Sequence, residues 1–332
     1  MEKRENAPLL EVKNLSVEYR TDAEVVKAVN GVNLSLNANE ALGLVGETGA
    51  GKTTTCRAII GLVQTPPGKV TSGEVYFEGK DLLKKKEREM RKIRGGDITM
   101  VFQDPMTSLN PSMTVGDQIM EVIRLHDKIS RAEAVLRAKE MLEMVGIPGA
   151  RYSEYPHQFS GGMKQRVVIA IALACNPKLL IADEPTTALD VTIQAQVLDL
   201  MKELKTKFNT SIVLITHDFG IVAEICEKVA VMYAGEIVES GRIDQIFNHR
   251  SHPYTVGLFG AIPSIDEDVE RLETIPGMPA NPADLPTGCK FHPRCKHCAE
   301  ICKQEAPKEI MIEEGHMVRC HLFANREKEA AE

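Results

Sequence analysis

The stretch Gly46-Glu47-Thr48-Gly49-Ala50-Gly51-Lys52-Thr53 fits the phosphate-loop pattern G-x-x-x-x-G-K-[ST] without exception. It follows the apolar run ALGLVG, which predicts a buried strand, and a helix is expected from about Gly51 to Gly61. Glycines let the backbone N–H groups turn inward around an anion, and the helix N-terminus adds partial positive charge. We expect Lys52 to reach the β and γ phosphates and the hydroxyl of Thr53 to bind Mg²⁺. The stretch therefore predicts a nucleotide-binding α/β fold.

A pair of carboxylates follows another predicted strand. The run LLIAD at 179–183 ends in Asp183, and Glu184 comes next. A carboxylate at a strand end can hold Mg²⁺ through water, and a second one beside it can act as general base on an attacking water. Asp-Glu after a strand is common by itself, but together with the phosphate loop it favours ATP hydrolysis.

Apolar runs and helical patterns alternate over most of the chain. Strands are predicted within 9–45 and at 73–77, 98–103, 179–183 and 211–216, with a hairpin in 229–241; helices are predicted at 114–144, 162–175, 191–208 and 219–227. The basic stretch 84–94 is interpreted as a solvated helix face, with a phosphate-binding patch as the alternative. This alternation predicts a sheet with parallel strands.

Composition narrows the class of protein. The chain has 332 residues, with 40 Lys and Arg against 47 Asp and Glu, 43 % apolar residues and 26 % charged residues. These proportions argue against a disordered or fibrous chain, and a net charge of −7 gives no support to nucleic-acid binding. The longest apolar run, Val167–Cys175, is far shorter than the roughly 20 residues of a spanning helix, and the N-terminus carries no apolar signal core.

Cysteines concentrate near the end of the chain. Of eight, Cys56, Cys175 and Cys226 are expected to be packing residues, while five lie within 289–320. The region beyond residue 260 is rich in proline. We therefore expect it to form little hydrophobic core of its own and to need a metal or covalent staple. Spacing alone allows a zinc site with four Cys or three Cys and one His, or an iron–sulfur cluster with four Cys.

Further motifs occur in a fixed order around the phosphate loop. They are Tyr19 upstream of it, Gln103 at a strand end, Ser160-Gly161-Gly162 opening a helix, Ala188-Leu189-Asp190 after Glu184, and His217 at the end of the next strand. This order resembles the ATPase subunit of an ABC transporter over about residues 8–260. The commonest signature of that family has Gln where this chain has Met163, and FSGGM-KQR is the form seen in peptide importers.

The resemblance implies a P-loop NTPase cassette with a RecA-like core, an antiparallel β subdomain and a helical subdomain at about 104–175. It implies that two subunits sandwich two ATP molecules, with Ser160, Gly161 and Gly162 serving the γ phosphate held by the opposite subunit. Glu184, His217 and Lys52 would be catalytic. Tyr19 would stack on adenine, Asp190 would communicate across the dimer, and Gln103 would complete the Mg²⁺ shell. The residues implied to contact Mg-ATP are Tyr19, Gly46, Glu47, Thr48, Gly49, Ala50, Gly51, Lys52, Thr53, Thr54, Gln103, Ser160, Gly161, Gly162, Asp183 and Asp190.

His252-Pro253-Tyr254-Thr255 and the sequence GCKFHPRC from Gly288 look like the oligopeptide/dipeptide importer ATPases, a group that also contains nickel importers. This implies an ATPase that energises import of di- or oligopeptides, with a nickel or other small-solute importer as the alternative. The partners implied are two transmembrane permease subunits, a second homologous ATPase subunit or a second copy of this chain, and an extracytoplasmic peptide-binding protein. The implied location is the cytoplasmic face of a prokaryotic cell membrane.

Within the same resemblance, Cys289, Cys295, Cys302 and Cys320 carry a pattern associated with a 4Fe-4S cluster. Cys298 lies outside that pattern but forms a close pair with Cys295, so it is a possible substitute ligand. Zinc, or thiols that are reduced or redox-active, remain alternatives. We therefore expect an ATPase domain at 1–260 and a metal-stapled extension at 261–332.

Overall fold

The computed structural model describes residues 7–187, 189–261 and 274–324, and divides the chain into two compact units. The first unit comprises Met1–Leu9, Leu36–Ala41 and Asp81–Thr216. The second comprises Leu10–Ser35, Leu42–Lys80 and His217–Glu332. The boundary expected near residue 260 stays a prediction.

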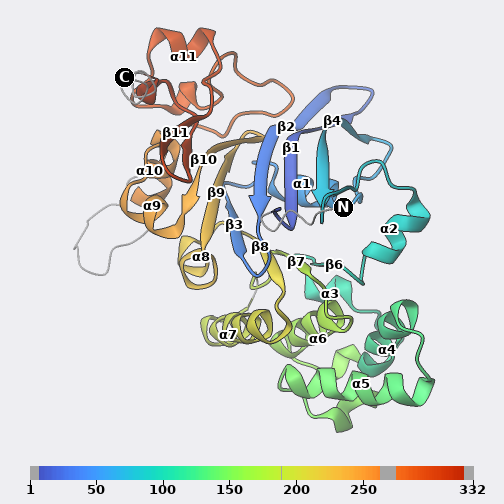
Figure 1. Cartoon of the computed structure of the whole chain (residues 1–332). Helices are drawn as coiled ribbons and strands as arrows, with labels where there is room; N and C mark the ends of the chain where they lie inside the picture. The colour runs from blue at the N-terminus through green and yellow to red at the C-terminus, as the bar shows by residue number, and fades with distance from the viewer. Residues whose placement is uncertain (1–6, 188, 262–273, 325–332) are drawn as a thin grey trace. The chain divides into compact units, whose positions relative to one another are not determined.

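The second unit contains the phosphate loop and the cysteine-rich region. Its strands are β1 (Leu10–Arg20), β2 (Val25–Leu36), β3 (Ala41–Val45), β4 (Gly68–Phe77), β9 (Lys228–Tyr233), β10 (Glu236–Arg242), β11 (Ile310–Glu313) and β12 (His316–Val318). β1 pairs antiparallel with β4, and β3 runs parallel to β9. Beyond β9 the sheet continues through β10, β12 and β11, each antiparallel to the strand before it. Figure 1 labels β9, β10 and β11 of this series.

The helices of this unit are short. They are α1 (Lys52–Ile59), α8 (Phe219–Ile225), α9 (Ile243–Asn248), α10 (Pro253–Gly260) and α11 (Glu300–Gln304), with 3-10 turns η3 (His292–Arg294) and η4 (His321–Phe323). α8 packs closely under β3, because a Cβ at Gly43 would lie 2.6 Å from a methyl group of Val222.

The first unit holds three parallel strands in the order β8 (Ser211–Thr216), β7 (Leu179–Asp183) and β6 (Ile98–Val101). Its helices are α2 (Glu87–Ile93), α3 (Pro105–Ser108), α4 (Val115–His126), α5 (Arg131–Met144), α6 (Gly161–Leu173) and α7 (Val191–Phe208), with 3-10 turns η1 (Gly149–Ser153) and η2 (Pro156–Gln158). The two-residue strand β5 (Lys80–Asp81) lies where the two units meet in sequence. α4, α5 and α6 gather into a helical region (Figure 1).

These elements confirm the predicted α/β fold with parallel strands. The expected helix at 114–144 is divided at Asp127, and the hydroxyl of Ser130 caps the second helix by accepting the N–H of Glu133. The basic stretch 84–94 contains α2, whose side chains are mostly exposed, as predicted. No helix in the described ranges is both long and apolar enough to cross a membrane.

The described residues 274–324 hold more regular structure than their sequence suggests. β11 and β12 form a hairpin that adds to β10, with Glu239 opposite Val318. The strands are too short for their apolar periodicity to stand out, so only pairing with β10 makes them visible. Residues 262–273 and 325–332, which the predicted extension also includes, lie outside the described residues.

Candidate functional site

The nucleotide loop at 46–53 joins β3 to α1, as the sequence predicted. A Cβ at Gly46 would lie 2.1 Å from the carbonyl oxygen of Met232, so only glycine fits at this close approach. Gly51 caps α1 with φ at +103°, a conformation that side chains disfavour, and a Cβ there would lie 2.3 Å from the carbonyl oxygen of Ala28. Two of the pattern glycines are thus fixed by contacts with neighbouring strands.

Lys52 lies inside this loop and is only 7 % exposed. Its Nζ donates to the carbonyl oxygens of Gly46 at 2.6 Å and Glu47 at 3.0 Å. The ammonium is therefore held at the N-terminus of α1, where a phosphate group would meet both its charge and the helix N–H groups. Thr53, the predicted Mg²⁺ ligand, follows in the first turn and is half-buried.

Glu47 is held from two directions that the sequence did not reveal. Its backbone N–H donates to the phenol oxygen of Tyr254 at 2.9 Å. Both terminal nitrogens of the Arg294 guanidinium donate to its carboxylate, at 2.7 and 3.0 Å. Tyr254 and Arg294 both lie in the motifs that carry the importer resemblance, but nothing in those motifs indicates contact with the phosphate loop.

The support for Tyr254 is a buried polar cluster. Burial lowers the pKa of His252 to about 4, so its ring is neutral near pH 7 and its Nδ1 accepts the N–H of Tyr254 at the start of α10. The carboxylate of Glu239 accepts the backbone N–H groups of Ser251 and His252 at 2.7 and 2.9 Å. The same carboxylate lies 2.8 Å from Nε2 of His316, and neither side chain is exposed. This cluster joins β10, β12 and the start of α10.

Two further predicted nucleotide contacts belong to the unit that contains the loop. Tyr19 is half-buried at the end of β1, and its ring edge lies 2.9 Å from the position of a Cβ on Gly68. His217 follows β8 directly and is exposed, next to Asp218, which caps α8. Their roles toward adenine and the γ phosphate stay predictions.

The predicted base Glu184 lies in the first unit, directly after Asp183 at the end of β7. Its φ is +47°, a strained conformation for a non-glycine residue and one that is frequent at functional sites. Its Oε2 accepts hydrogen bonds from Nε2 of Gln103 at 2.8 Å and from the hydroxyl of Thr187 at 3.0 Å. The structure thus joins the predicted base to the predicted Mg²⁺ ligand Gln103.

The signature segment begins α6. Ser160 is the N-cap residue, and Gly162 packs so closely on α7 that a Cβ would lie 2.3 Å from a methyl group of Ile193. Asp190 caps α7 by accepting the N–H of Ile193 at 2.9 Å. The predicted dimer-contact segment therefore packs against the signature segment within one unit. Ala188, part of the same prediction, lies outside the described residues.

Four cysteines of the extension influence each other's charge. Burial, with smaller contributions from neighbouring thiolates, raises the pKa of Cys289 and Cys320 to about 11, and Cys295 and Cys302 contribute to both. Cys298 is exposed, and its charge contributes to the raised pKa of Cys295. The four cysteines of the predicted pattern thus lie near one another. However, no group of three or more His, Cys, Asp or Glu among the described residues is arranged to hold a metal ion, so the structure does not support the predicted staple.

The scattered cysteines agree with their predicted packing role in two of three cases. Cys56 and Cys226 are buried, whereas Cys175 is half-buried. Burial raises the pKa of Cys175 to about 11, so its thiol stays protonated near pH 7.

Comparison with known proteins divides the chain into two matched regions. Residues 29–187 match the family described as ABC transporter, and residues 238–302 match the oligopeptide/dipeptide transporter C-terminal region. The second match contains Tyr254 and Arg294, the two residues that hold Glu47.

Curated relatives resemble the chain over nearly its whole length. The oligopeptide transport ATP-binding protein OppD of Haemophilus influenzae is 52 % identical, covering 96 % of this chain and 98 % of the relative. The dipeptide transport ATP-binding protein DppD of Bacillus subtilis is 48 % identical, with 97 % of each covered. Among solved structures, a dimeric ATP-binding cassette in a post-hydrolysis state bound to ADP and Pi matches with a TM-score of 0.64 and 30 % identity, covering 70 % of this chain and 98 % of that one.

Proposed function

Because the chain belongs to the oligopeptide/dipeptide family of ABC transporter ATP-binding subunits, we propose that its nucleotide loop and Glu184 hydrolyse ATP to energise peptide import. The observation that carries this proposal is the Lys52 ammonium enclosed by the phosphate loop, in a chain 52 % identical to an oligopeptide transport ATPase. The activity is that of an ATPase that uses ATP and Mg²⁺.

Each of the predicted site residues has a separate role in the proposed hydrolysis of ATP. Lys52 and the N–H groups at the start of α1 bind and neutralise the β and γ phosphates. Glu184 takes a proton from the water that attacks the γ phosphate, and Gln103 and Thr187 orient its carboxylate. His217 contacts the γ phosphate. Thr53, Gln103 and Asp183 are the residues that would hold Mg²⁺, which would neutralise charge on the phosphates.

Each complete nucleotide site is formed by two ATPase subunits. The N-terminus of α6, with Ser160 and Gly162, binds the γ phosphate held by the opposite subunit, where its helix N–H groups meet the charge. The dimeric arrangement of the matched cassette supports this proposal. The opposite subunit is a homologous ATPase or a second copy of this chain.

The partners follow from the family. We assign this subunit to the cytoplasmic face of a prokaryotic membrane, against two transmembrane permease subunits that receive solute from an extracytoplasmic peptide-binding protein. The bacterial oligopeptide and dipeptide relatives favour peptides over nickel as the solute.

We expect peptide to stimulate the ATPase of the assembled importer. The complex of this chain with its permease, reconstituted in liposomes together with the binding protein, hydrolyses ATP faster when a di- or oligopeptide is added. Phosphate release measured with peptide, with nickel and without solute checks this. Stimulation by nickel alone would replace the peptide assignment by the nickel alternative.

The proposal includes a 4Fe-4S cluster on Cys289, Cys295, Cys302 and Cys320. Its support is the chemistry of the donor set, since four thiolates suit an iron–sulfur cluster. When bound, the cluster would lock a proline-rich segment that has little core of its own. Zinc on the same thiolates is the alternative.

Purified without oxygen, the full chain is expected to be brown, with broad absorption near the blue end of the spectrum. Cys302→Ser removes a proposed ligand and should abolish this absorption, whereas the matched control Cys298→Ser should retain it, because Cys298 is exposed and outside the set. Iron and sulfide analysis accompanies the spectra. A colourless protein with stoichiometric zinc would support zinc, and loss of colour in Cys298→Ser would make Cys298 a ligand.

A further inference from the structure

The cysteine-rich extension contacts the nucleotide loop through one ion pair. Arg294, in the 3-10 turn η3, has a side chain only 5 % exposed, and Glu47 lies between Gly46 and Thr48 in the phosphate loop. The guanidinium donates to both carboxylate oxygens, at 2.7 and 3.0 Å. Such a paired geometry fixes orientation as well as distance. The nearby Glu47 carboxylate raises the pKa of Arg294, so the guanidinium stays charged.

The contact continues from Glu47 to the phosphate-binding cation. The carbonyl oxygen of Glu47 accepts from Nζ of Lys52 at 3.0 Å and from the N–H of Ala50 at 3.1 Å. Its N–H is held by Tyr254. Arg294 therefore fixes a loop residue whose side chain, N–H and carbonyl oxygen all have partners that shape the loop.

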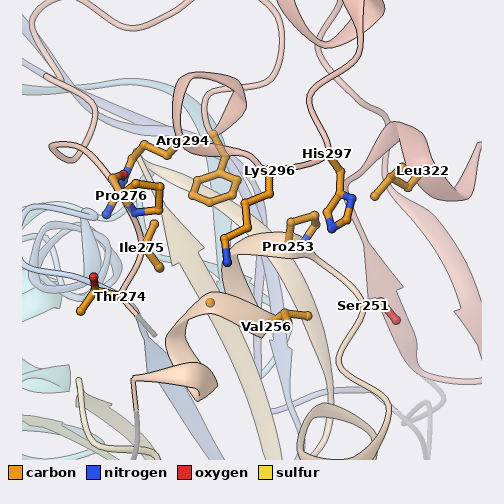
Figure 2. Close-up of a pocket in the computed structure, with 12 residues that line it drawn as sticks. Ser251, Pro253, Val256, Thr274, Ile275, Pro276, Arg294, Lys296, His297 and Leu322 are labelled. Carbon is orange, nitrogen blue, oxygen red and sulfur yellow. The ribbon is translucent and has the colours of Figure 1, made fainter. Parts of the chain in front are cut away.

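Arg294 itself is held rigidly. Its Nε donates to the carbonyl oxygen of Pro276 at 3.0 Å, and its guanidinium lies 5.8 Å from the ring centre of Tyr233. The ring of Phe291, three residues before it, packs against Tyr233 and Tyr254 at 5.3 and 5.4 Å between ring centres. Figure 2 shows Arg294 beside Pro276 at one end of a cavity of about 160 Å³.

We propose that Arg294 is a positioning residue for the nucleotide loop, and that the cysteine-bearing segment sets the ATP affinity of its own subunit by delivering this side chain. The inference rests on the proposed ATPase function. A loop held in its binding geometry before ATP arrives loses less conformational freedom on binding, so the ion pair acts on nucleotide affinity more than on the chemical step. Arg294 touches no reacting group and acts through Glu47.

The test compares Arg294→Gln, Arg294→Lys, Glu47→Gln and the double variant Glu47→Gln/Arg294→Gln in the full chain. Arg319→Gln is the matched control. Arg319 also directly precedes a cysteine of the extension and pairs with carboxylates, but these belong to Glu309 and Glu236, neither of which is a residue of the phosphate loop. Equilibrium binding of a fluorescent ATP analogue gives Kd, steady-state ATPase gives KM and kcat, and thermal unfolding gives Tm.

Arg294→Gln is expected to raise Kd and KM about tenfold, the size of one lost charge-assisted hydrogen bond, with kcat nearly unchanged. Glu47→Gln should match it, and the double variant should be no weaker than either single one, because both remove the same interaction. Arg294→Lys should restore part of the affinity, since it retains the charge. Arg319→Gln should lower Tm without changing Kd.

Several results would overturn the proposal. They are wild-type affinity in Arg294→Gln, an equal loss of affinity in Arg319→Gln, or full additivity in the double variant. If Arg294→Gln does not fold, the Kd of Arg294→Lys compared with that of the control Arg319→Gln still tests the proposal: wild-type affinity in Arg294→Lys contradicts the need for the paired geometry. A wild-type chain that binds no nucleotide would instead contradict the proposed function, so the two failures are distinguishable.

Discussion

Glu184→Gln lowers the ATPase rate of the assembled protein by roughly 10²–10⁴-fold, the usual contribution of a general base. The amide is isosteric with the carboxylate, and its oxygen can still accept from Gln103 and Thr187, so the site keeps its shape. It cannot take a proton from the attacking water. ATP binding is retained, and the ATP-bound dimer accumulates.

Phosphate release, equilibrium binding of ATP and size-exclusion chromatography with Mg-ATP check these outcomes together. Glu203→Gln, which alters an exposed carboxylate on α7, serves as the control and should behave as wild type. Wild-type turnover in Glu184→Gln would remove Glu184 from the role of base. Failure to bind ATP would assign it to binding instead.

Lys52→Ala should lower kcat by roughly 10²–10³-fold, comparable with removal of one preorganised donor from a charge-stabilising site, and should weaken ATP binding as well. Lys52 is buried and points to loop carbonyl oxygens, so no neighbouring cation in the loop sequence takes its place. This differs from Glu184→Gln, for which binding survives.

ATPase kinetics and equilibrium nucleotide binding distinguish the two roles. Lys69→Ala removes an exposed lysine of β4 in the same unit and should leave both measurements unchanged. Tight ATP binding with slow hydrolysis in Lys52→Ala would restrict Lys52 to the chemical step. Normal hydrolysis would contradict its assignment altogether.

Local signals predicted most of the ATPase correctly. The phosphate loop is a contiguous motif, so its position between a buried strand and a helix follows from neighbouring residues alone. The helix starts at Ser160 and Asp190 were likewise readable, because an N-cap residue bonds to an N–H three residues on. Local signals did not predict β11 and β12, because these short strands depend on pairing with a partner strand.

The sequence by itself determined the phosphate-loop motif, the pair of carboxylates at the end of β7 and the family to which these motifs belong. Only the tertiary structure decided that Arg294 holds Glu47, across 247 positions of the chain, and that Glu239 pairs with His316. The physical reason is that motifs report short-range backbone geometry, whereas these hydrogen-bonded pairs form only where the folded chain brings together side chains that are far apart in sequence. The phosphate loop could therefore be predicted from its own eight residues, whereas its contact with the cysteine-rich extension could not.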